Sequence, residues 1–101
     1  MKRVFKDHKY CQACIFEEEN GTFLVSYTTT VCDVDQDGWL HCSGTYSATT
    51  RKHIGYFCKE MNYKICYQDV KRAYEKDMFV NVWTGEFKPH PEIKPIMHAA
   101  G

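Results

Sequence analysis

The first half of the chain is patterned as β-strands joined by short polar turns. Residues 22–34 (TFLVSYTTTVCDV) are rich in β-branched and aromatic types and contain neither glycine nor proline, which favours extended structure. Asn20-Gly21 precedes this stretch, and Asn-Gly is the dipeptide that most favours a tight hairpin. Such a turn pairs Glu19 with Thr22. A second polar turn at 35–38 leads into residues 39–42 (WLHC). The pattern predicts antiparallel strands that follow one another as a meander.

The second half of the chain changes to a helical period. Ser47 or Thr49 can cap a helix that runs to about residue 60, because a hydroxyl accepts a hydrogen bond from the first free N–H groups. Apolar side chains then recur with the spacing of one helix face. These residues are Ile54, Phe57, Cys58 and Met61.

A second, shorter helix is predicted near residues 67–76, with Val70, Ala73 and Tyr74 on its apolar face. Residues 78–83 (MFVNVW) return to strand character, and Thr84-Gly85 ends them. We predict an α+β fold with three to four antiparallel strands in a meander and two helices packed on one face of the sheet. Residues 1–101 form a single domain, and 88–101 form a proline-containing tail on its surface.

The charge balance narrows the classes of function. The 101 residues carry 13 Lys and Arg against 13 Asp and Glu, so the formal net charge is zero. General electrostatic binding of nucleic acid needs clustered positive charge, so we expect no direct sequence-specific binding to nucleic acid. The charged first ten residues lack the apolar stretch of a secretory signal, and no apolar run is long enough to span a membrane. We therefore expect a cytoplasmic protein.

The six cysteines include one spacing that is typical of metal sites. Cys11 and Cys14 form a C-x-x-C pair, which can bind one zinc ion from a tight turn. In the predicted meander Cys32 is a diagonal neighbour of Cys11, and a three-residue loop places Cys42 opposite Cys32. A two-residue loop instead brings His41 opposite Cys32. The prediction is a structural zinc bound by four cysteines, or by three cysteines and His41.

Other interpretations of these residues stay open. Cysteines are common in protein cores as free thiols, which is the simpler interpretation for Cys58 on its helix face. Cys66, at the start of the second helix, fits either a thiol or a ligand. Residues 33–38 (DVDQDG) match the opening of a calcium loop, but position twelve is Gly44 in place of the bidentate glutamate, so a polar β-turn is favoured.

No pattern in the chain points to catalysis. The five histidines show neither HxxxH nor HExxH spacing, and no phosphate-binding loop or nucleophile elbow is present. A binding protein is therefore favoured over an enzyme, and tyrosines among basic residues on the predicted helices indicate a partner surface. The candidate contact residues are Arg51, Lys52, Tyr56, Lys71 and Arg72.

Two segments resemble a family of small phage and mobile-element proteins of uncharacterised domain type. Residues 24–31 (LVSYTTTV) match its "SYxT" strand, and 44–54 (GTYSATTRKHI) match its "YSxTTxKH" helix start; the resemblance covers about residues 22–60. A cysteine-rich chain of this length also looks like a zinc-containing type II-A anti-CRISPR protein. That resemblance implies a prophage protein that binds Cas9 stoichiometrically and blocks DNA cleavage. The alternative is a zinc-ribbon-like accessory protein that binds nucleic acid.

Overall fold

The computed structural model describes residues 2, 3, 5, 12–43 and 47–89, which form two helices and seven strands. The strands are β1 (Lys2–Arg3), β2 (Ala13–Glu18), β3 (Gly21–Ser26), β4 (Thr29–Val34), β5 (Trp39–Cys42), β6 (Met78–Asn81) and β7 (Phe87–Pro89). The helices are α1 (Ala48–Glu60) and α2 (Tyr67–Glu75).

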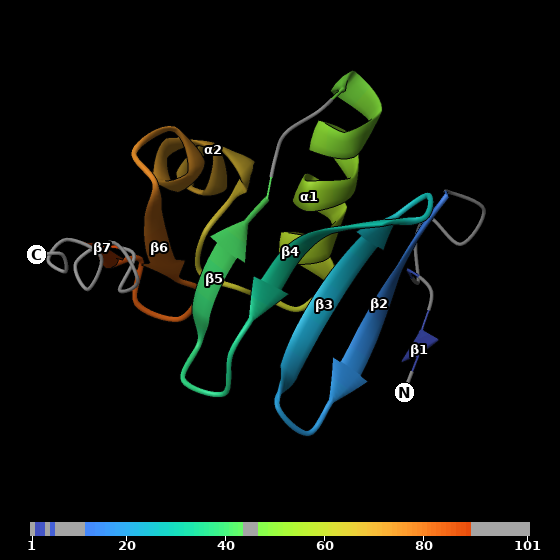
Figure 1. Ribbon diagram of the computed structural model, residues 1–101, viewed down its shortest axis with the longest axis horizontal. Coiled ribbons are helices and arrows are strands. Elements are labelled where there is room, and N and C mark those ends of the chain that lie inside the picture. The colour runs from blue at the N-terminus through green and yellow to red at the C-terminus, as the bar shows by residue number, and fades with distance from the viewer. Residues whose placement is uncertain (1, 4, 6–11, 44–46, 90–101) are drawn as a thin grey trace, which may run out of the picture.

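All seven strands form one antiparallel sheet in the order of the chain, from β1 to β7. Both helices are inserted between β5 and β6, and they lie together on one face of the sheet (Figure 1). The predicted α+β class and the meander are therefore confirmed. The predicted number of three to four strands is too low.

One of the additional strands comes from residues 22–34. This stretch forms two strands, β3 and β4, which reverse direction at Tyr27 and Thr28. Tyr27 adopts a left-handed backbone with φ of 60°, a conformation that a tyrosine rarely takes. The turn contains no Gly, Pro, Asn or Asp, so the sequence carries no signal for it.

The first hairpin also turns one residue earlier than predicted. Glu19 and Asn20 form the turn, and Glu17 rather than Glu19 pairs with Thr22. Gly21 begins β3, where a Cβ atom would lie 2.6 Å from the Val34 carbonyl oxygen of β4. The glycine is therefore needed for close approach of two strands rather than for the turn itself.

Both predicted helices are confirmed, with the expected cap on the first. The Ser47 side chain accepts a hydrogen bond from the Thr50 amide at 3.2 Å and begins α1. In α2, Cys66 is the N-cap residue, and its amide donates to the Asp69 carboxylate at 3.0 Å. That contact satisfies a backbone donor at the start of the helix.

The core lies between the two helices and the adjoining sheet face. On α1 the predicted apolar stripe is buried, except that Met61 packs at its edge. Tyr74 of α2 was expected in this core but is 43% exposed. The sheet contributes mainly Ile15, Leu24, Cys32, Leu40, Cys42 and Val80.

The sheet continues into the predicted tail. Lys88 and Pro89, the first two residues of the predicted tail, belong to β7, which pairs with β6. An edge strand tolerates proline because its missing N–H can face solvent. Residues 90–101 lie outside the described part of the chain. Within the described part, neither helix is long and apolar enough to cross a membrane.

Candidate functional site

The structure brings together two of the four predicted zinc ligands. Cys32 of β4 lies directly opposite Cys42 of β5, as expected for a three-residue loop, and His41 lies opposite Asp33. Cys14 belongs to β2, and β3 separates that strand from β4. The sheet alternation also places half-exposed Cys14 on the opposite face from buried Cys32. Cys11 lies outside the described residues.

The buried thiols are held in their protonated form. A hydrogen bond with Cys42 and burial raise the pKa of Cys32 well above its usual range. Burial also raises the pKa of Cys58 to about 12. Burial is typical of cysteine thiols packed in a protein core. Among the described residues, no three His, Cys, Asp or Glu side chains are grouped to hold a metal ion.

The turn at 35–38 has the geometry of a polar β-turn. The Asp35 carboxylate accepts hydrogen bonds from the backbone amides of Asp37 at 2.9 Å and Trp39 at 3.0 Å. Gly38 takes a left-handed φ of 92°. Because Asp35 accepts hydrogen bonds from backbone donors of its own turn, the segment has the geometry of the predicted polar β-turn.

His53 packs inside the protein rather than at its surface. Its Nδ1 lies 2.7 Å from the Ser26 hydroxyl, and both residues are buried. Burial lowers the pKa of His53 below its usual range. Although a serine and a histidine are in contact, the pair is enclosed, with Ser26 only 3% exposed. The Ser26–His53 contact connects β3 to α1 and forms part of the packed core.

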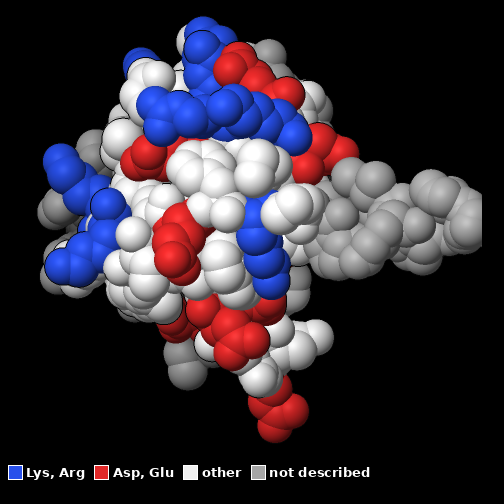
Figure 2. Space-filling model, turned by 90° about the vertical axis from the view of Figure 1, so that its left-hand side faces the viewer, with Lys and Arg blue, Asp and Glu red and all other residues white. Residues whose placement is uncertain are grey.

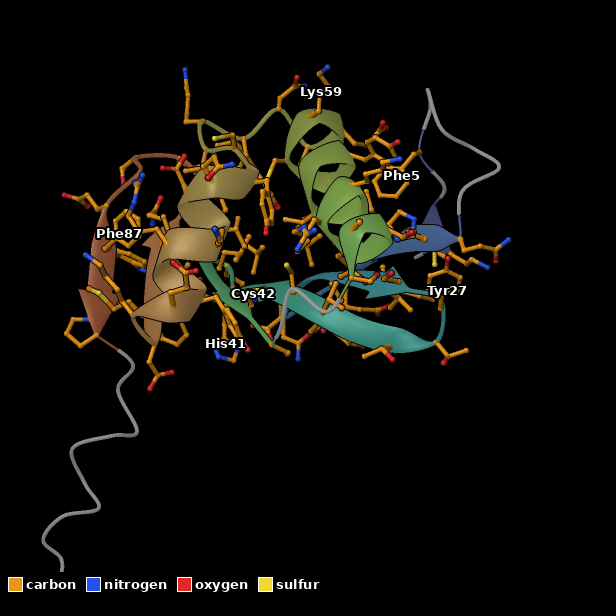
Figure 3. The ribbon with its side chains drawn as sticks, turned by 90° about the horizontal axis from the view of Figure 1, so that it is seen from above. Phe5, Tyr27, His41, Cys42, Lys59 and Phe87 are labelled. Atoms are coloured by element: carbon orange, nitrogen blue, oxygen red, sulfur yellow. The ribbon has the colours of Figure 1, made fainter. Side chains whose placement is uncertain are left out.

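The sheet face away from the helices carries a row of partly exposed aromatic residues. Phe16, Phe23, Asp33 and His41 are successive partners across β2, β3, β4 and β5. The His41 ring then contacts the Phe79 ring of β6, with 5.7 Å between the centroids. Figure 3 shows His41 on the side of the sheet away from α1 and α2.

A lysine and a tryptophan complete this surface. The Lys88 ammonium of β7 lies 4.3 Å from the centre of the Trp39 ring and 5.6 Å from that of Phe79. Such contacts keep a cation over aromatic faces while leaving part of each ring accessible. We call this surface the open face. Its members are Phe16, Phe23, Asp33, Trp39, His41, Phe79 and Lys88.

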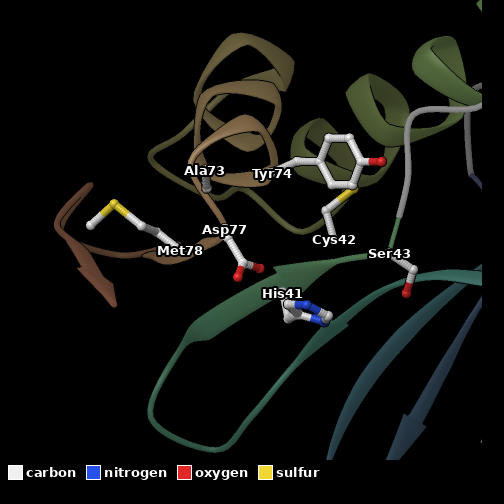
Figure 4. Close-up of a pocket in the computed structure, with 7 residues that line it drawn as sticks. All are labelled: His41, Cys42, Ser43, Ala73, Tyr74, Asp77 and Met78. Atoms are coloured by element: carbon white, nitrogen blue, oxygen red, sulfur yellow. The ribbon is translucent and has the colours of Figure 1, made fainter. Parts of the chain in front are cut away.

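A pocket of about 300 Å³ adjoins the open face at His41. It lies between the end of β5, the last turn of α2 and the beginning of β6 (Figure 4). The Asp77 carboxylate points toward the His41 ring across the pocket, and the Tyr74 ring lies above Cys42. The lining residues are His41, Cys42, Ser43, Ala73, Tyr74, Asp77 and Met78.

The Asp33 carboxylate lies beside the His41 ring at the edge of the pocket. Nδ1 of His41 lies 4.0 Å from Oδ2 of Asp33, the neighbour on β4. The Asp77 carboxylate faces the same ring from the pocket (Figure 4). The pocket lining therefore contains one carboxylate, that of Asp77, together with the apolar side chains of Ala73 and Met78.

Three of the five predicted contact residues on the helices already have contacts within the protein. Lys71 lies 3.8 Å from Glu75, and Arg72 lies 3.4 Å from Asp69, so each pairs along its own helix. Tyr56 packs edge-on against Phe5 at a centroid distance of 6.1 Å. Arg51 and Lys52 are exposed in the first turn of α1.

Charge is unevenly distributed over the surface. Figure 2 faces the side with α2, β6 and β7, where Lys and Arg gather toward the top and acidic groups toward the bottom. The acidic end contains the two hairpin turns at 19–20 and 35–38. A side-chain hydrogen bond from Gln36 to the Glu19 carbonyl, at 2.6 Å, links these turns.

Sequence reasoning missed the pocket and most of the open face. The helical period assigns Tyr74 to the core, and nothing in the sequence distinguishes Asp77 from other surface acids. The aromatic row depends on pairing between strands whose boundaries are hidden at Tyr27. Only the placement of Trp39 and His41 on one face follows directly from strand alternation.

Comparison with known proteins places most of the chain in one family. A model described as a family of unknown function matches residues 5–76, which include β2 to β5 and both helices. The match ends just before Asp77 and Met78, so the pocket extends past the matched region. No curated protein matches the chain, and no solved structure matches it.

Proposed function

The chain belongs to the DUF8033 family, a family of unknown function, and from this premise we propose that it is a non-catalytic protein that binds another protein through its open face. The observation that carries the proposal is the row of partly exposed aromatic side chains on a sheet face that no described helix covers. Aromatic residues supply large contact areas with little loss of side-chain freedom, which suits the centre of an interface.

The polar groups of the open face support a specific rather than a general hydrophobic contact. Asp33 and His41 lie in the middle of the row, with Phe23 on one side and Phe79 on the other. A partner that covers them must supply matching donors and acceptors, because unpaired polar groups are costly when they are buried. The arrangement favours recognition of one partner surface.

The partner that we propose to test first is Cas9. This choice rests on the resemblance of the sequence to type II-A anti-CRISPR proteins, and the proposed activity is stoichiometric inhibition of target DNA cleavage. A domain of this size can inhibit a larger protein by covering about 800 Å² of its surface. The protein would then act in the cytoplasm of the bacterial host.

The direct experiment is a Cas9 cleavage assay with increasing amounts of the purified chain. We expect inhibition that saturates near one chain per Cas9, and we expect Phe23→Thr on the open face to weaken it. Threonine suits a strand, so this variant removes the ring with little change in strand preference. The matched control combines Lys52→Ala and Lys71→Ala on the helices. Full cleavage at large excess would exclude Cas9 as the partner.

The control variant also tests the earlier assignment of contact residues. If Lys52→Ala with Lys71→Ala weakens inhibition while Phe23→Thr does not, the interface is on the helices and the open face is not used. If only the open-face variant is affected, Arg51, Lys52, Tyr56, Lys71 and Arg72 are not the main contacts. Each result therefore identifies which of the two surfaces contacts Cas9.

A second candidate function is nucleic-acid binding, and the same open face is the observation that favours it. Bases can stack on exposed aromatic rings, and Lys88 supplies a positive charge beside Trp39. Asp33 and the zero net charge oppose this candidate. Binding of the chain alone to single-stranded DNA or RNA, with steep weakening by salt, would favour it over protein binding.

We retain structural zinc as a separate proposal. Its support is the Cys11-x-x-Cys14 spacing, whereas Cys32 and Cys42 lie on the other face of the sheet from Cys14. Elemental analysis of the purified chain tests it. One zinc per chain that Cys14→Ser removes and Cys42→Ser retains would assign the ion to the first pair without the second.

A further inference from the structure

The pocket beside the open face has the chemistry of a cation site. We propose that it binds the guanidinium group of an arginine side chain on the protein partner. This inference rests on the proposed function, because it names the chemical group that the partner must present next to the open face. Three features at the C-terminal end of α2 favour a positive charge: the Asp77 carboxylate, the helix end and the Tyr74 ring.

The first feature is the Asp77 carboxylate. Asp77 follows α2 in a left-handed conformation with φ of 56°, which turns the chain into β6 and directs the carboxylate across the pocket toward His41 (Figure 4). Within the described part of the chain, Asp77 makes no ion pair and no side-chain hydrogen bond. An exposed carboxylate at a pocket wall is thus available to a ligand.

The second feature is the end of α2. Ala73 and Tyr74 line the pocket and lie in the last turn of this nine-residue helix. The aligned peptide dipoles give the C-terminal end of a helix a partial negative charge. The carbonyls of Arg72 and Tyr74 already accept hydrogen bonds from the Lys76 and Asp77 amides, so the helix contributes through its dipole. A cation in the pocket therefore gains from the helix as well as from Asp77.

The third feature is the Tyr74 ring. Tyr74 is 43% exposed although the helical spacing predicts it in the core, and its ring forms part of the pocket wall. An aromatic face attracts a cation, and a planar guanidinium can stack on it. The combination of a carboxylate and an aromatic ring suits arginine better than lysine, whose ammonium cannot stack in this way.

Three cations on α2 and β7 already have contacts away from the pocket. On α2, Lys71 lies within pairing distance of Glu75 and Arg72 within pairing distance of Asp69. Lys88 lies over the Trp39 ring. The volume of about 300 Å³ accommodates a side chain rather than a large cofactor. An arginine that enters from the open face would place its backbone over the aromatic row.

The test uses the full chain and a small probe, so it does not depend on the identity of the partner. N-acetyl-arginine amide is titrated to tens of millimolar while backbone amide signals are followed by NMR. We expect saturable shifts for Ser43, Tyr74 and Asp77. N-acetyl-citrulline amide has nearly the same shape without the charge, and it should bind at least about fivefold more weakly.

Matched variants assign the effect to the pocket. Asp77→Asn removes the charge, and asparagine tolerates the left-handed backbone, so the fold is retained. Asp37→Asn makes the same change at the distant turn. We expect the first variant to lose the shifts and the second to keep them. If Asp77→Asn disturbs the spectrum as a whole, Tyr74→Ala is the substitute and should weaken binding.

Several results would overturn the inference. Equal shifts from arginine and citrulline probes would show that charge is not recognised. Retained shifts in Asp77→Asn would place the cation elsewhere, and an absence of shifts would show that the pocket does not bind the group. Arginine-specific shifts without inhibition of Cas9 would support the pocket and reject that partner, so the two failures can be distinguished.

Discussion

The Ser26 hydroxyl on β3 lies 2.7 Å from Nδ1 of His53 on α1, and this buried hydrogen bond connects the sheet to the first helix. The His53 ring also lies near the rings of Tyr27 and Tyr56, with centroid distances of 5.9 Å and 6.3 Å. A neutral imidazole fits these surroundings. A protonated one would carry an uncompensated charge into a site that is largely closed to water.

We therefore expect folding stability to fall as the solution becomes acidic. Burial lowers the pKa of His53 in the folded chain, while the unfolded chain keeps a value near about 6.5. Between these two values the unfolded chain binds more protons, so the free energy of unfolding decreases as pH falls below about 6.5. Urea unfolding at a series of pH values from 8 to 5 measures this slope.

His53→Asn provides the control for that slope. The asparagine amide can hydrogen-bond the Ser26 hydroxyl as donor or acceptor, but the side chain does not titrate in this range. The variant should be less stable at pH 8 because it loses ring packing, and it should show a smaller decrease toward pH 5. An unchanged slope would assign the acid sensitivity to other groups.

Asn81 should be important for the end of the sheet. It is buried, its amide donates to the Asp37 carbonyl at 3.1 Å, and its oxygen accepts from the amides of Trp83 at 2.9 Å and Thr84 at 3.1 Å. Asn81→Ala leaves these groups unpaired and should lower the free energy of unfolding by about 1–3 kcal/mol. Thermal and urea unfolding provide the measurement.

The effect of Asn81 can be divided between its donor and its acceptor. Asn81→Asp keeps an oxygen for the Trp83 and Thr84 amides but loses donation to the Asp37 carbonyl. The free energy of unfolding of Asn81→Asp should therefore differ from that of Asn81→Ala. If both variants retain wild-type stability, the side chain does not hold the β6–β7 turn in place.

Local signals in the sequence account for much of the fold. The Ser47 cap and the apolar period specify α1, and the polar turn at 35–38 specifies the pairing of Cys32 with Cys42. Both features depend on residues that are close in the sequence and have strong conformational preferences. The turn at Tyr27 has no such preference, because the surrounding strands impose its left-handed backbone. That single turn determines which strands are neighbours.

The candidate site depends on contacts that local signals do not contain. Cys14 and Cys32 do not converge as the predicted zinc site requires, because the hidden turn inserts β3 between their strands. Asp77 and His41 meet only because β6 returns beside β5 after two helices. An isolated aspartate or tyrosine in the sequence is compatible with many positions, so the pocket emerges only from the packing of α2 on the sheet.

Thiol labelling should separate the cysteines by burial. Cys32, Cys42 and Cys58 are buried and should react slowly with iodoacetamide in the folded chain, since the reactive species is the exposed thiolate. Cys14 and Cys66 are accessible to different degrees and should react first. Mass spectrometry of peptides after a short labelling time identifies the sites.

The same labelling reports on zinc. A bound ion at Cys14 would protect this partly exposed thiol, and a chelator would then increase its labelling while Cys66 stays unchanged. Equal labelling of Cys14 with and without chelator would argue against a metal ligand at this position. Rapid labelling of Cys32 in the folded chain would contradict its burial.

Gly38 should be the least replaceable of three glycines that can be compared directly. Its φ is 92°, and an added Cβ would lie 2.6 Å from Cδ1 of Trp83. Gly38→Ala should therefore lower the free energy of unfolding by both backbone strain and steric overlap, together about 1–3 kcal/mol. Gly85 has a φ of 81° with no atom near the added Cβ, so Gly85→Ala isolates the strain.

Gly55 completes the comparison because it lies inside α1 with open space around its added Cβ. Gly55→Ala should stabilise the chain by about 0.5–1 kcal/mol, since alanine restricts the unfolded chain and favours the helix. Urea unfolding of the three variants should give the order Gly55→Ala, Gly85→Ala, Gly38→Ala from most to least stable. Adding Trp83→Ala should recover part of the Gly38→Ala loss, because it removes the overlapping ring. If Gly38→Ala and Gly85→Ala lose the same stability, the Trp83 ring moves aside at no cost and the contact does not constrain the turn.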